Sequence, residues 1–198
     1  MFGPLVSTEW LAAHLDAPDV RIVDIRGHVL PATQPPPHYF SHREDYLRSH
    51  IPGAVFVDWV HDITDENDPR RARLAPPAQF AALMSRLGIS NETVVIAYDD
   101  AQGMFAARLW WALRYYGHER VAVLDGGWQK WVQEGRPVTE VVPEIAPALF
   151  VARPNPEWIR SLSEVRDVVN GTQRAVLLDL RSREEFLGQA SRAARAGH

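Results

Sequence analysis

The sequence predicts an α/β protein built around a parallel sheet. Apolar runs of five or six residues alternate with stretches whose apolar residues recur at helical spacing. These runs are apolar almost throughout, which is typical of strands buried on both faces of a parallel sheet. With 198 residues, 46% of them hydrophobic and 23% charged, the chain is long enough to bury such a core.

The first half of the predicted module is a helix followed by two strands. Within residues 8–15 the apolar positions share one helical face behind a Ser-Thr pair suited to capping. Residues 21–26 form a β-branched run ending in charge, as expected of a buried strand whose polar end reaches the sheet edge. Residues 27–44 contain three consecutive prolines and are predicted as a loop, and a turn then leads into an apolar strand over 54–58.

The second half alternates helix and strand. Residues 80–87 have helical spacing and end before a glycine, and residues 93–98 form an apolar strand. A long helix over 105–116 is apolar on most sides, which indicates burial. A strand over 120–124 follows, and a pair of glycines at 126–127 opens the last helix. This alternation is the pattern of a parallel α/β domain covered on both faces.

Charge and composition exclude several classes of function. Lys and Arg number 21 against 25 Asp and Glu, a formal net charge of -4, so we expect no basic surface for nucleic acid or an anionic membrane. Cysteine is absent, which excludes disulfides, thiolate metal sites and cysteine nucleophiles from these residues. The first 15 residues lack a basic signal-peptide start, and no apolar run approaches about 18 residues. We therefore expect a soluble, cytoplasmic protein.

Two parts of the chain are alike. Residues 156–159 (Pro-Glu-Trp-Ile) are similar to residues 8–11 (Thr-Glu-Trp-Leu), and residues 175–181 repeat the strand and Asp-x-Arg ending of residues 21–26. Such similarity indicates a tandem repeat whose second copy stops early. We expect a first domain over residues 1–136, a proline-rich linker over 137–156 and an incomplete second copy over 157–198, which includes a strand over 175–180.

Several motifs carry a resemblance to a known family. They are Asp24-Ile25-Arg26, His50-Ile51-Pro52-Gly53-Ala54, Val95-Ile96-Ala97-Tyr98-Asp99 before the Arg108-Leu109-Trp110-Trp111 helix, Val123-Leu124-Asp125-Gly126-Gly127-Trp128, and Asp179-Leu180-Arg181-Ser182 through Phe186-Leu187-Gly188. In this order and spacing they resemble the tandem rhodaneses, the sulfurtransferase family that includes thiosulfate and 3-mercaptopyruvate sulfurtransferases. The resemblance covers nearly the whole chain and implies two similar modules, the second of them truncated here.

The resemblance also implies a function. For the complete protein it implies transfer of a sulfane sulfur from a small anionic donor to a thiol or cyanide through a cysteine persulfide, without a cofactor. The second module of such proteins usually carries the cysteine and the first is usually inactive, so we expect this chain to be inactive as given. The alternative is a non-catalytic rhodanese-like module with a binding or regulatory role. A coding sequence that continues after His198 into Ile-Pro-Gly and then a cysteine favours the transferase.

The candidate site is the loop over residues 99–104. It joins a strand to a helix, so its backbone N–H groups and the helix dipole favour an anion. By the resemblance, Asp99 occupies the position of the nucleophilic cysteine, and no catalytic residue is expected in this chain. Two interpretations of Asp99 and Asp100 stay open: the pair caps the following helix, or it lines a cleft between the domains.

Charged pairs end both copies of the repeated strand. We expect Asp24 with Arg26, and Asp179 with Arg181, to form local ion pairs. The resemblance adds a second interpretation of Arg181 as a substrate-binding residue, whose planar guanidinium binds the anionic donor in the complete protein. Both interpretations of Arg181 stay open.

The remaining candidates are histidines and one acid. His38 and His42 are four residues apart, but the prolines before them disfavour a helix and a third ligand is lacking, so no metal site is expected. His50 and His118 are expected to hydrogen-bond the backbone at turns. By the resemblance, Asp65 matches an acid of mercaptopyruvate-type members, but their histidine is missing from residues 70–74, so the donor class stays open.

Overall fold

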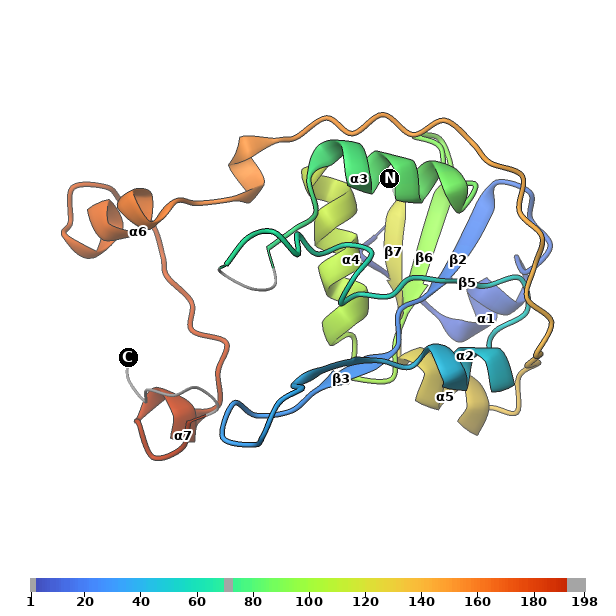
Figure 1. The fold of residues 1–198 in the computed structure, drawn as a ribbon, viewed down its shortest axis with the longest axis horizontal. Helices are drawn as coiled ribbons and strands as arrows, with labels where there is room; N and C mark the ends of the chain where they lie inside the picture. Colours follow the sequence, from blue (N-terminus) through green and yellow to red (C-terminus); the bar gives the residue numbers. More distant parts are fainter. Residues whose placement is uncertain (1–2, 70–72, 192–198) are drawn as a thin grey trace. The chain divides into compact units, whose positions relative to one another are not determined.

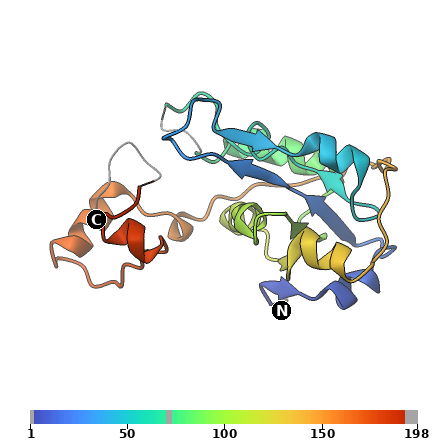
Figure 2. The same cartoon turned by 90° about the horizontal axis from the view of Figure 1, so that it is seen from below.

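The computed structural model describes residues 3–69 and 73–191 and divides into two compact units. Unit 1 comprises Met1–His28 and Ser41–Asn155, and unit 2 comprises Val29–Phe40 and Pro156–His198. Figures 1 and 2 show the elements of each unit in two perpendicular views. In the ranges described, no helix is long and apolar enough to cross a lipid bilayer.

Unit 1 contains a five-stranded parallel sheet with the order β1-β7-β6-β2-β5. The strands are β1 (Leu5–Val6), β2 (Val20–Asp24), β5 (Val55–Phe56), β6 (Val94–Tyr98) and β7 (Val121–Leu124). Every described pairing in this sheet is parallel, and Asp24 of β2 lies opposite both Tyr98 of β6 and Phe56 of β5. The predicted parallel α/β fold is confirmed. The sequence did not indicate β1, because two residues show no periodicity.

Helices cover both faces of this sheet (Figures 1 and 2). They are α1 (Thr8–Ala12), α2 (Arg43–Arg48), α3 (Pro77–Arg86), α4 (Met104–Tyr115) and α5 (Gly127–Gln133). Ile22 and Ile96 of the sheet form one core cluster with Leu11 of α1 and Trp131 of α5. Side chains at alternate strand positions point to the opposite face, where α4 packs on β6 and β7.

The prediction of a loop over residues 27–44 is wrong. β3 (Gly27–Val29) and β4 (Tyr39–Ser41) pair as a two-stranded ribbon, and α2 begins shortly after it. The three prolines at 35–37 lie in the connection between the strands rather than within them. Because proline has no N–H to donate, a strand pair can form only where the prolines lie outside the strands, as they do here.

Residues 137–155 have no helix and no named strand, yet they are held to the rest of unit 1. His50 and Thr139 exchange two backbone hydrogen bonds of 2.9 Å. The ring of Phe150 is 3% exposed and packs against Phe80 of α3, with the ring centres 6.0 Å apart. This semi-extended stretch is therefore fixed along its length by hydrogen bonds and by one buried aromatic side chain.

Residues 156–191 of unit 2 contain only short elements. They are the 3-10 helix η1 (Pro156–Trp158) and the helices α6 (Leu162–Val169) and α7 (Arg183–Phe186). Both α-helices begin with a capping box, formed by Ser161 with Glu164 and by Ser182 with Glu185. Local capping thus defines these helices, because none of the described residues of unit 2 is buried.

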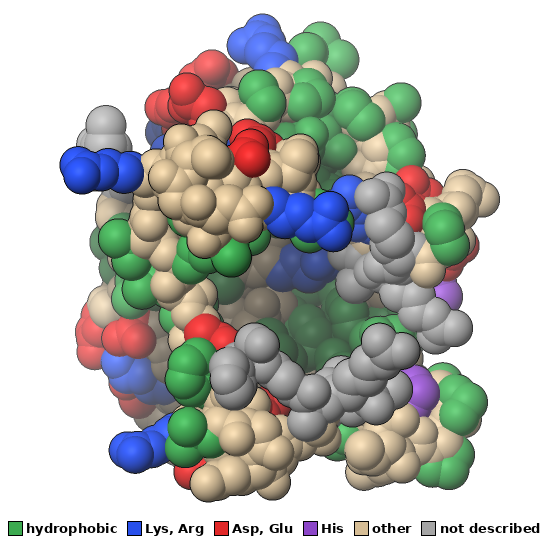
Figure 3. Space-filling model, turned by 90° about the vertical axis from the view of Figure 1, so that its left-hand side faces the viewer, with side chains coloured by type: hydrophobic (Ala, Val, Ile, Leu, Met, Phe, Trp, Pro, Cys, Tyr) green, Lys and Arg blue, Asp and Glu red, His purple; other side chains and the backbone are tan. Residues whose placement is uncertain are grey.

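The strand expected over residues 175–180 is not formed. Val176, Leu178 and Leu180 are 83%, 78% and 92% exposed, respectively. Hydrophobic side chains reach the molecular surface in the space-filling view (Figure 3). The expectation failed because a strand needs a neighbouring strand to pair its N–H and C=O groups, and the described part of unit 2 offers none to this segment.

Candidate functional site

The loop over residues 99–103 joins β6 to α4 at the carboxyl end of the sheet. β2 and β6 are neighbours, but the chain passes from β2 to β5 on one side and from β6 to β7 on the other. Open α/β sheets commonly bind ligands at such a reversal of strand order. Gln102 and Gly103 have φ angles of 57° and 87°, so the loop bends sharply before α4. The candidate loop therefore lies where this fold usually binds ligands.

The Asp99 carboxylate is the centre of this loop. Its Oδ1 accepts hydrogen bonds from the N–H groups of Ala101 (2.9 Å) and Gly103 (2.8 Å). Its Oδ2 accepts from the N–H groups of Phe105 (2.7 Å) and Ala106 (2.8 Å). The residue is 1% exposed, so one buried carboxylate satisfies four backbone donors.

These bonds confirm that Asp99 caps the following helix. Phe105 and Ala106 lie in the first turn of α4, where N–H groups have no partner within the helix. A negative charge at a helix N-terminus also interacts favourably with the helix dipole. The N–H groups of the loop thus donate to its own Asp99 carboxylate, where they would otherwise donate to an external anion.

Asp100 does not share this role, and its interpretation as a cap is wrong. Its Oδ1 accepts from the N–H of Gly27 at 3.2 Å, and its Oδ2 contacts Nδ1 of His42 at 2.6 Å. Nε2 of His42 in turn lies 2.7 Å from Nδ1 of His28. Sequence reasoning missed this chain of side chains, because its members are distant in sequence and share no local pattern.

Asp24 and Arg26 form the expected ion pair, and it is buried at the end of β2. Nε of Arg26 donates to both Asp24 oxygens at 3.1 and 2.9 Å, and Nη2 donates to the carbonyl of Ser49 at 2.7 Å. The Tyr98 hydroxyl donates to Asp24 at 2.6 Å. The guanidinium carbon lies 4.2 Å from the ring centre of Trp128. Burial raises the pKa of Asp24, and the charge of Arg26 opposes that rise.

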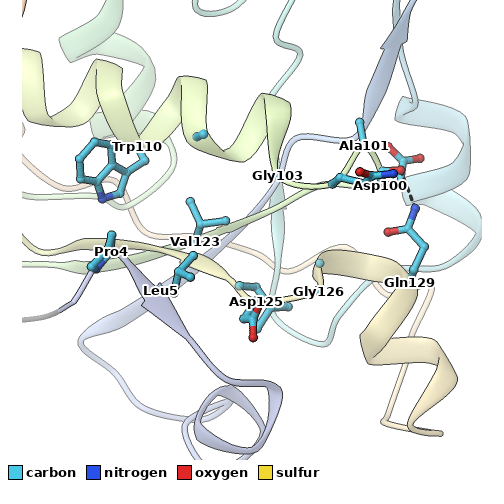
Figure 4. Close-up of a pocket in the computed structure, with 14 residues that line it drawn as sticks. Pro4, Leu5, Asp100, Ala101, Gly103, Trp110, Val123, Asp125, Gly126 and Gln129 are labelled. Carbon is cyan, nitrogen blue, oxygen red and sulfur yellow. Dashed lines mark hydrogen bonds between the residues drawn. The ribbon is translucent and has the colours of Figure 1, made fainter. Parts of the chain in front are cut away.

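A cavity of about 860 Å³ opens beside the loop (Figure 4). Trp110, Pro4 and Val123 supply apolar wall at one end, and Asp125 and Gln129 lie at the other. The backbone of the candidate loop forms part of the lining, where the carbonyl of Asp100 accepts a 2.5 Å hydrogen bond from Gln129 Nε2. A largely apolar cavity with a few polar groups is typical of a binding site.

Arg181 lies in unit 2 and repeats the local geometry of Arg26. Its Nε donates to both oxygens of Asp179 at 3.0 Å, and its backbone N–H donates to Oδ1 at 3.0 Å. These hydrogen bonds lower the pKa of Asp179 to about 2. The expected local ion pair is therefore confirmed, here with exposed side chains, and the donor-binding role of Arg181 stays a prediction.

The remaining candidates form no further site. His50 and His118 contact backbone carbonyls, as expected. His38 contacts the carbonyl of Gln34. Throughout residues 3–69 and 73–191, no group of three or more His, Cys, Asp or Glu side chains is arranged to hold a metal ion.

The segment compared with mercaptopyruvate-type proteins is described only in part. The Asp65 carboxylate accepts a hydrogen bond from the N–H of Asn67 at 3.0 Å. Residues 70–72, within the stretch where those proteins supply a histidine, lie outside the described residues. The donor class therefore stays open.

Known proteins identify the family. The family model for the rhodanese-like domain matches residues 7–134. The chain belongs to the rhodanese family. Its homologues are sulfurtransferases: it is 35% identical over 194 residues to thiosulfate sulfurtransferase of Bos taurus and 32% identical over 181 residues to 3-mercaptopyruvate sulfurtransferase of Escherichia coli K12. It is also 36% identical over 207 residues to the sulfur carrier protein TtuD of Thermus thermophilus.

These matches cover most of this chain but only part of each relative. They cover 98%, 95% and 91% of this chain and 66%, 62% and 62% of TtuD, the bovine enzyme and the E. coli enzyme. The crystal structure of SseA, a 3-mercaptopyruvate sulfotransferase of E. coli, superposes with a TM-score of 0.75 at 32% identity, covering 86% of this chain and 63% of SseA. The chain thus spans somewhat less than two thirds of the length of these relatives.

Proposed function

We propose that residues 7–134 are a non-catalytic rhodanese module of a sulfurtransferase, and that residues 157–198 belong to a second module of the same kind. The observation that carries the first part is the position of Asp99, whose carboxylate occupies the four N–H groups of the loop. The second part is supported by the repeated Asp-x-Arg hydrogen bonds at Arg26 and Arg181.

Sulfur transfer needs a nucleophile that this chain lacks. In the proposed reaction a thiolate attacks the outer sulfur of thiosulfate, the S–S bond breaks, and sulfite leaves with the bonding electron pair. The resulting persulfide then gives its outer sulfur to cyanide or a thiol and returns to the thiolate. Because the 198 residues contain no cysteine, the proposal places the persulfide outside these residues. A carboxylate at position 99 cannot replace it.

In this proposal the second module binds the anionic donor. There the guanidinium of Arg181 would bind the oxyanion of the donor through paired hydrogen bonds. At present it pairs with Asp179, and the two side chains are 41% and 32% exposed.

Turnover of the 198-residue chain tests the first part. With thiosulfate and cyanide we expect no thiocyanate above the buffer rate. We expect the same for Asp99→Cys, because a thiolate at position 99 would itself occupy the N–H groups of the loop and leave no anion site for the donor. Thiocyanate formation that a thiol reagent abolishes in Asp99→Cys would show that the loop is competent and would contradict the proposal.

A binding measurement tests whether the loop is an anion site filled by its own side chain. We expect sulfate or thiosulfate to raise the thermal midpoint of Asp99→Ala and to leave that of the wild type unchanged, because only the variant has vacant N–H groups. Asp19→Ala, which removes an exposed carboxylate just before β2 and away from the cavity, is the matched control. Equal shifts in all three proteins would contradict the assignment.

The cavity beside the loop favours a second candidate function, a non-catalytic binding or regulatory module. Its apolar walls suit a partner or ligand irrespective of sulfur chemistry. Assay of the natural full-length product distinguishes the two functions. Sulfur transfer by that product supports the transferase, and its absence favours the binding module.

A further inference from the structure

A second concave region lies beside β5, the last strand in the order of the sheet. It has a volume of about 480 Å³, and its lining includes Arg43, Tyr46, Phe56, Arg86, Leu87 and Ile145. We call it the β5 groove. It shares no lining residue with the cavity at the candidate loop, so a ligand of the β5 groove is independent of the proposed function.

The backbone of β5 leaves hydrogen-bonding groups available on its outer side. The N–H of Val57 donates to the carbonyl of Asp24 at 2.9 Å, so residues 55 and 57 face β2. The N–H and C=O of Phe56, between them, face away from the sheet. No described residue bonds to either group, although Phe56 is only 7% exposed. An added strand would pair both of these groups.

Two arginines place positive charge on the β5 groove. The guanidinium of Arg43 lies 5.8 Å from the ring centre of Phe56, and no carboxylate of the described residues lies within 4.0 Å of it. Arg86 forms an ion pair of 3.8 Å with Asp62, whose carboxylate also lines the groove. Two arginines against one carboxylate give the lining a net positive charge, so the complementary ligand is an anion.

The walls between these arginines are apolar. Leu87 ends α3, and Ile145 belongs to the semi-extended stretch that follows α5. Tyr46 and Phe56 form a buried aromatic pair with their ring centres 5.2 Å apart. The β5 groove thus combines an unpaired strand edge, aliphatic and aromatic walls, and a net positive charge from Arg43.

We propose that the β5 groove binds a short extended peptide that carries a carboxylate side chain beside aliphatic ones. Only a strand-like backbone pairs both the N–H and the C=O of Phe56, which is the β-augmentation mode of peptide recognition. Successive side chains of such a strand point to opposite sides, so the acid reaches an arginine while its neighbours contact Leu87 or Ile145. A fatty acid could pair its carboxylate with an arginine and pack its chain against the apolar walls. It would leave the N–H and C=O of Phe56 without hydrogen-bond partners.

Binding of a defined peptide tests the proposal. The probe is a fluorescein-labelled peptide of sequence Gly-Val-Glu-Val-Asp-Gly, followed by fluorescence anisotropy with the full 198-residue chain. We expect Arg43→Gln with Arg86→Gln to weaken binding by at least about tenfold, the effect of losing charge-assisted contacts. Arg48→Gln is the matched control, because Arg48 lies on the same helix but pairs with Glu44 and Asp45. The control is expected to bind as the wild type does.

Hydrogen exchange at the Phe56 amide distinguishes a strand from other ligands. We expect the probe to slow exchange at this amide, and a probe with N-methylated valines not to bind. Absence of probe binding at millimolar concentration, equal binding of a Gly-Val-Lys-Val-Lys-Gly peptide, or no effect of the double arginine change would overturn the proposal. Displacement of the probe by decanoate without any protection of the Phe56 amide would assign the groove to an amphiphile instead.

Discussion

Asp99 stabilises the α4 end of its loop through four hydrogen bonds to one carboxylate. We expect Asp99→Ala to lower the free energy of unfolding by about 2–4 kcal/mol, since it removes a helix cap and leaves buried N–H groups unpaired. Urea denaturation measures this loss. Asp125→Ala, at a 60% exposed side chain after β7, is the control and should stay within about 0.5 kcal/mol of wild type. Equal effects of the two changes would refute the capping role.

The chain contains the same ion pair twice, once buried and once exposed. Arg26→Met leaves the Asp24 carboxylate buried without its countercharge, which should cost about 3–5 kcal/mol of unfolding free energy. Arg181→Met removes the same hydrogen bonds from an exposed pair, and solvent replaces them. We therefore expect a large fall of the urea midpoint for the first variant and none for the second. A comparable fall in both variants would show that the Asp-x-Arg geometry, rather than burial, determines how much the ion pair contributes to the free energy of unfolding.

The pH dependence of the Arg26→Met variant follows from Asp24. Burial already raises the pKa of this carboxyl in the folded state, and loss of Arg26 removes the charge that opposes the rise. Between the unfolded and the folded pKa the folded state holds the additional proton, so stability falls as pH rises through this window. We expect the stability gap between wild type and Arg26→Met to widen from about pH 4 to about pH 7. Urea midpoints that differ by a constant amount over this range would contradict this assignment.

At the scale of elements, the sequence predicted a helix or strand correctly wherever burial gives it a long apolar run or a clear apolar face. β2, β6 and β7 are near-continuous apolar runs, and α4 ends at a glycine, so each could be placed within about two residues of its bounds. The ribbon of β3 and β4 was missed because its residues are half-exposed and flank prolines. The strand expected over residues 175–180 has the right composition, but composition cannot supply the neighbouring strand that it needs.

The candidate site was predictable to a lesser degree. The position of the loop and the capping by Asp99 followed from a strand–loop–helix pattern with an acid at its start. The contacts of Asp100 with His42 and of Arg26 with Trp128 join residues far apart in the chain. Such contacts depend on the order of strands in the sheet, which no local pattern reveals.

The stretch after α5 offers a test at the same scale. Phe150 is 3% exposed, whereas its neighbour Leu149 is 76% exposed. We expect Phe150→Ala to cost about 3 kcal/mol and to render residues 137–155 sensitive to protease, because this ring is the buried anchor of the stretch. Leu149→Ala should change neither property. Mass spectrometry of the cleavage products reports the first new site, and cleavage of both variants at the same rate would contradict the anchoring role.

At the scale of the whole molecule, the two units differ in what stabilises them. The core side chains lie in unit 1, while none of the described residues of unit 2 is buried. Ordering the backbone costs about 1–2 kcal/mol per residue, and α6 and α7, with 8 and 4 residues, are shorter than the roughly 12–15 residues that an isolated helix needs. Unit 2 thus lacks the apolar burial that offsets this cost.

Limited proteolysis of the monomeric chain should therefore release residues beyond about 155 and leave a resistant core that ends there. The boundary follows Asn155, because the N–H of Asn155 still donates to the carbonyl of Tyr115 at 2.7 Å and no later described residue is buried. Amide exchange of Val176, Leu178 and Leu180 should be as fast as in an unfolded peptide, since these residues form no strand. Size-exclusion chromatography before digestion ensures that only monomer is tested, because exposed aliphatic side chains promote association. Equal protease resistance of unit 2 and unit 1 in that monomer would show that residues 156–191 are stable without a buried core, against this argument.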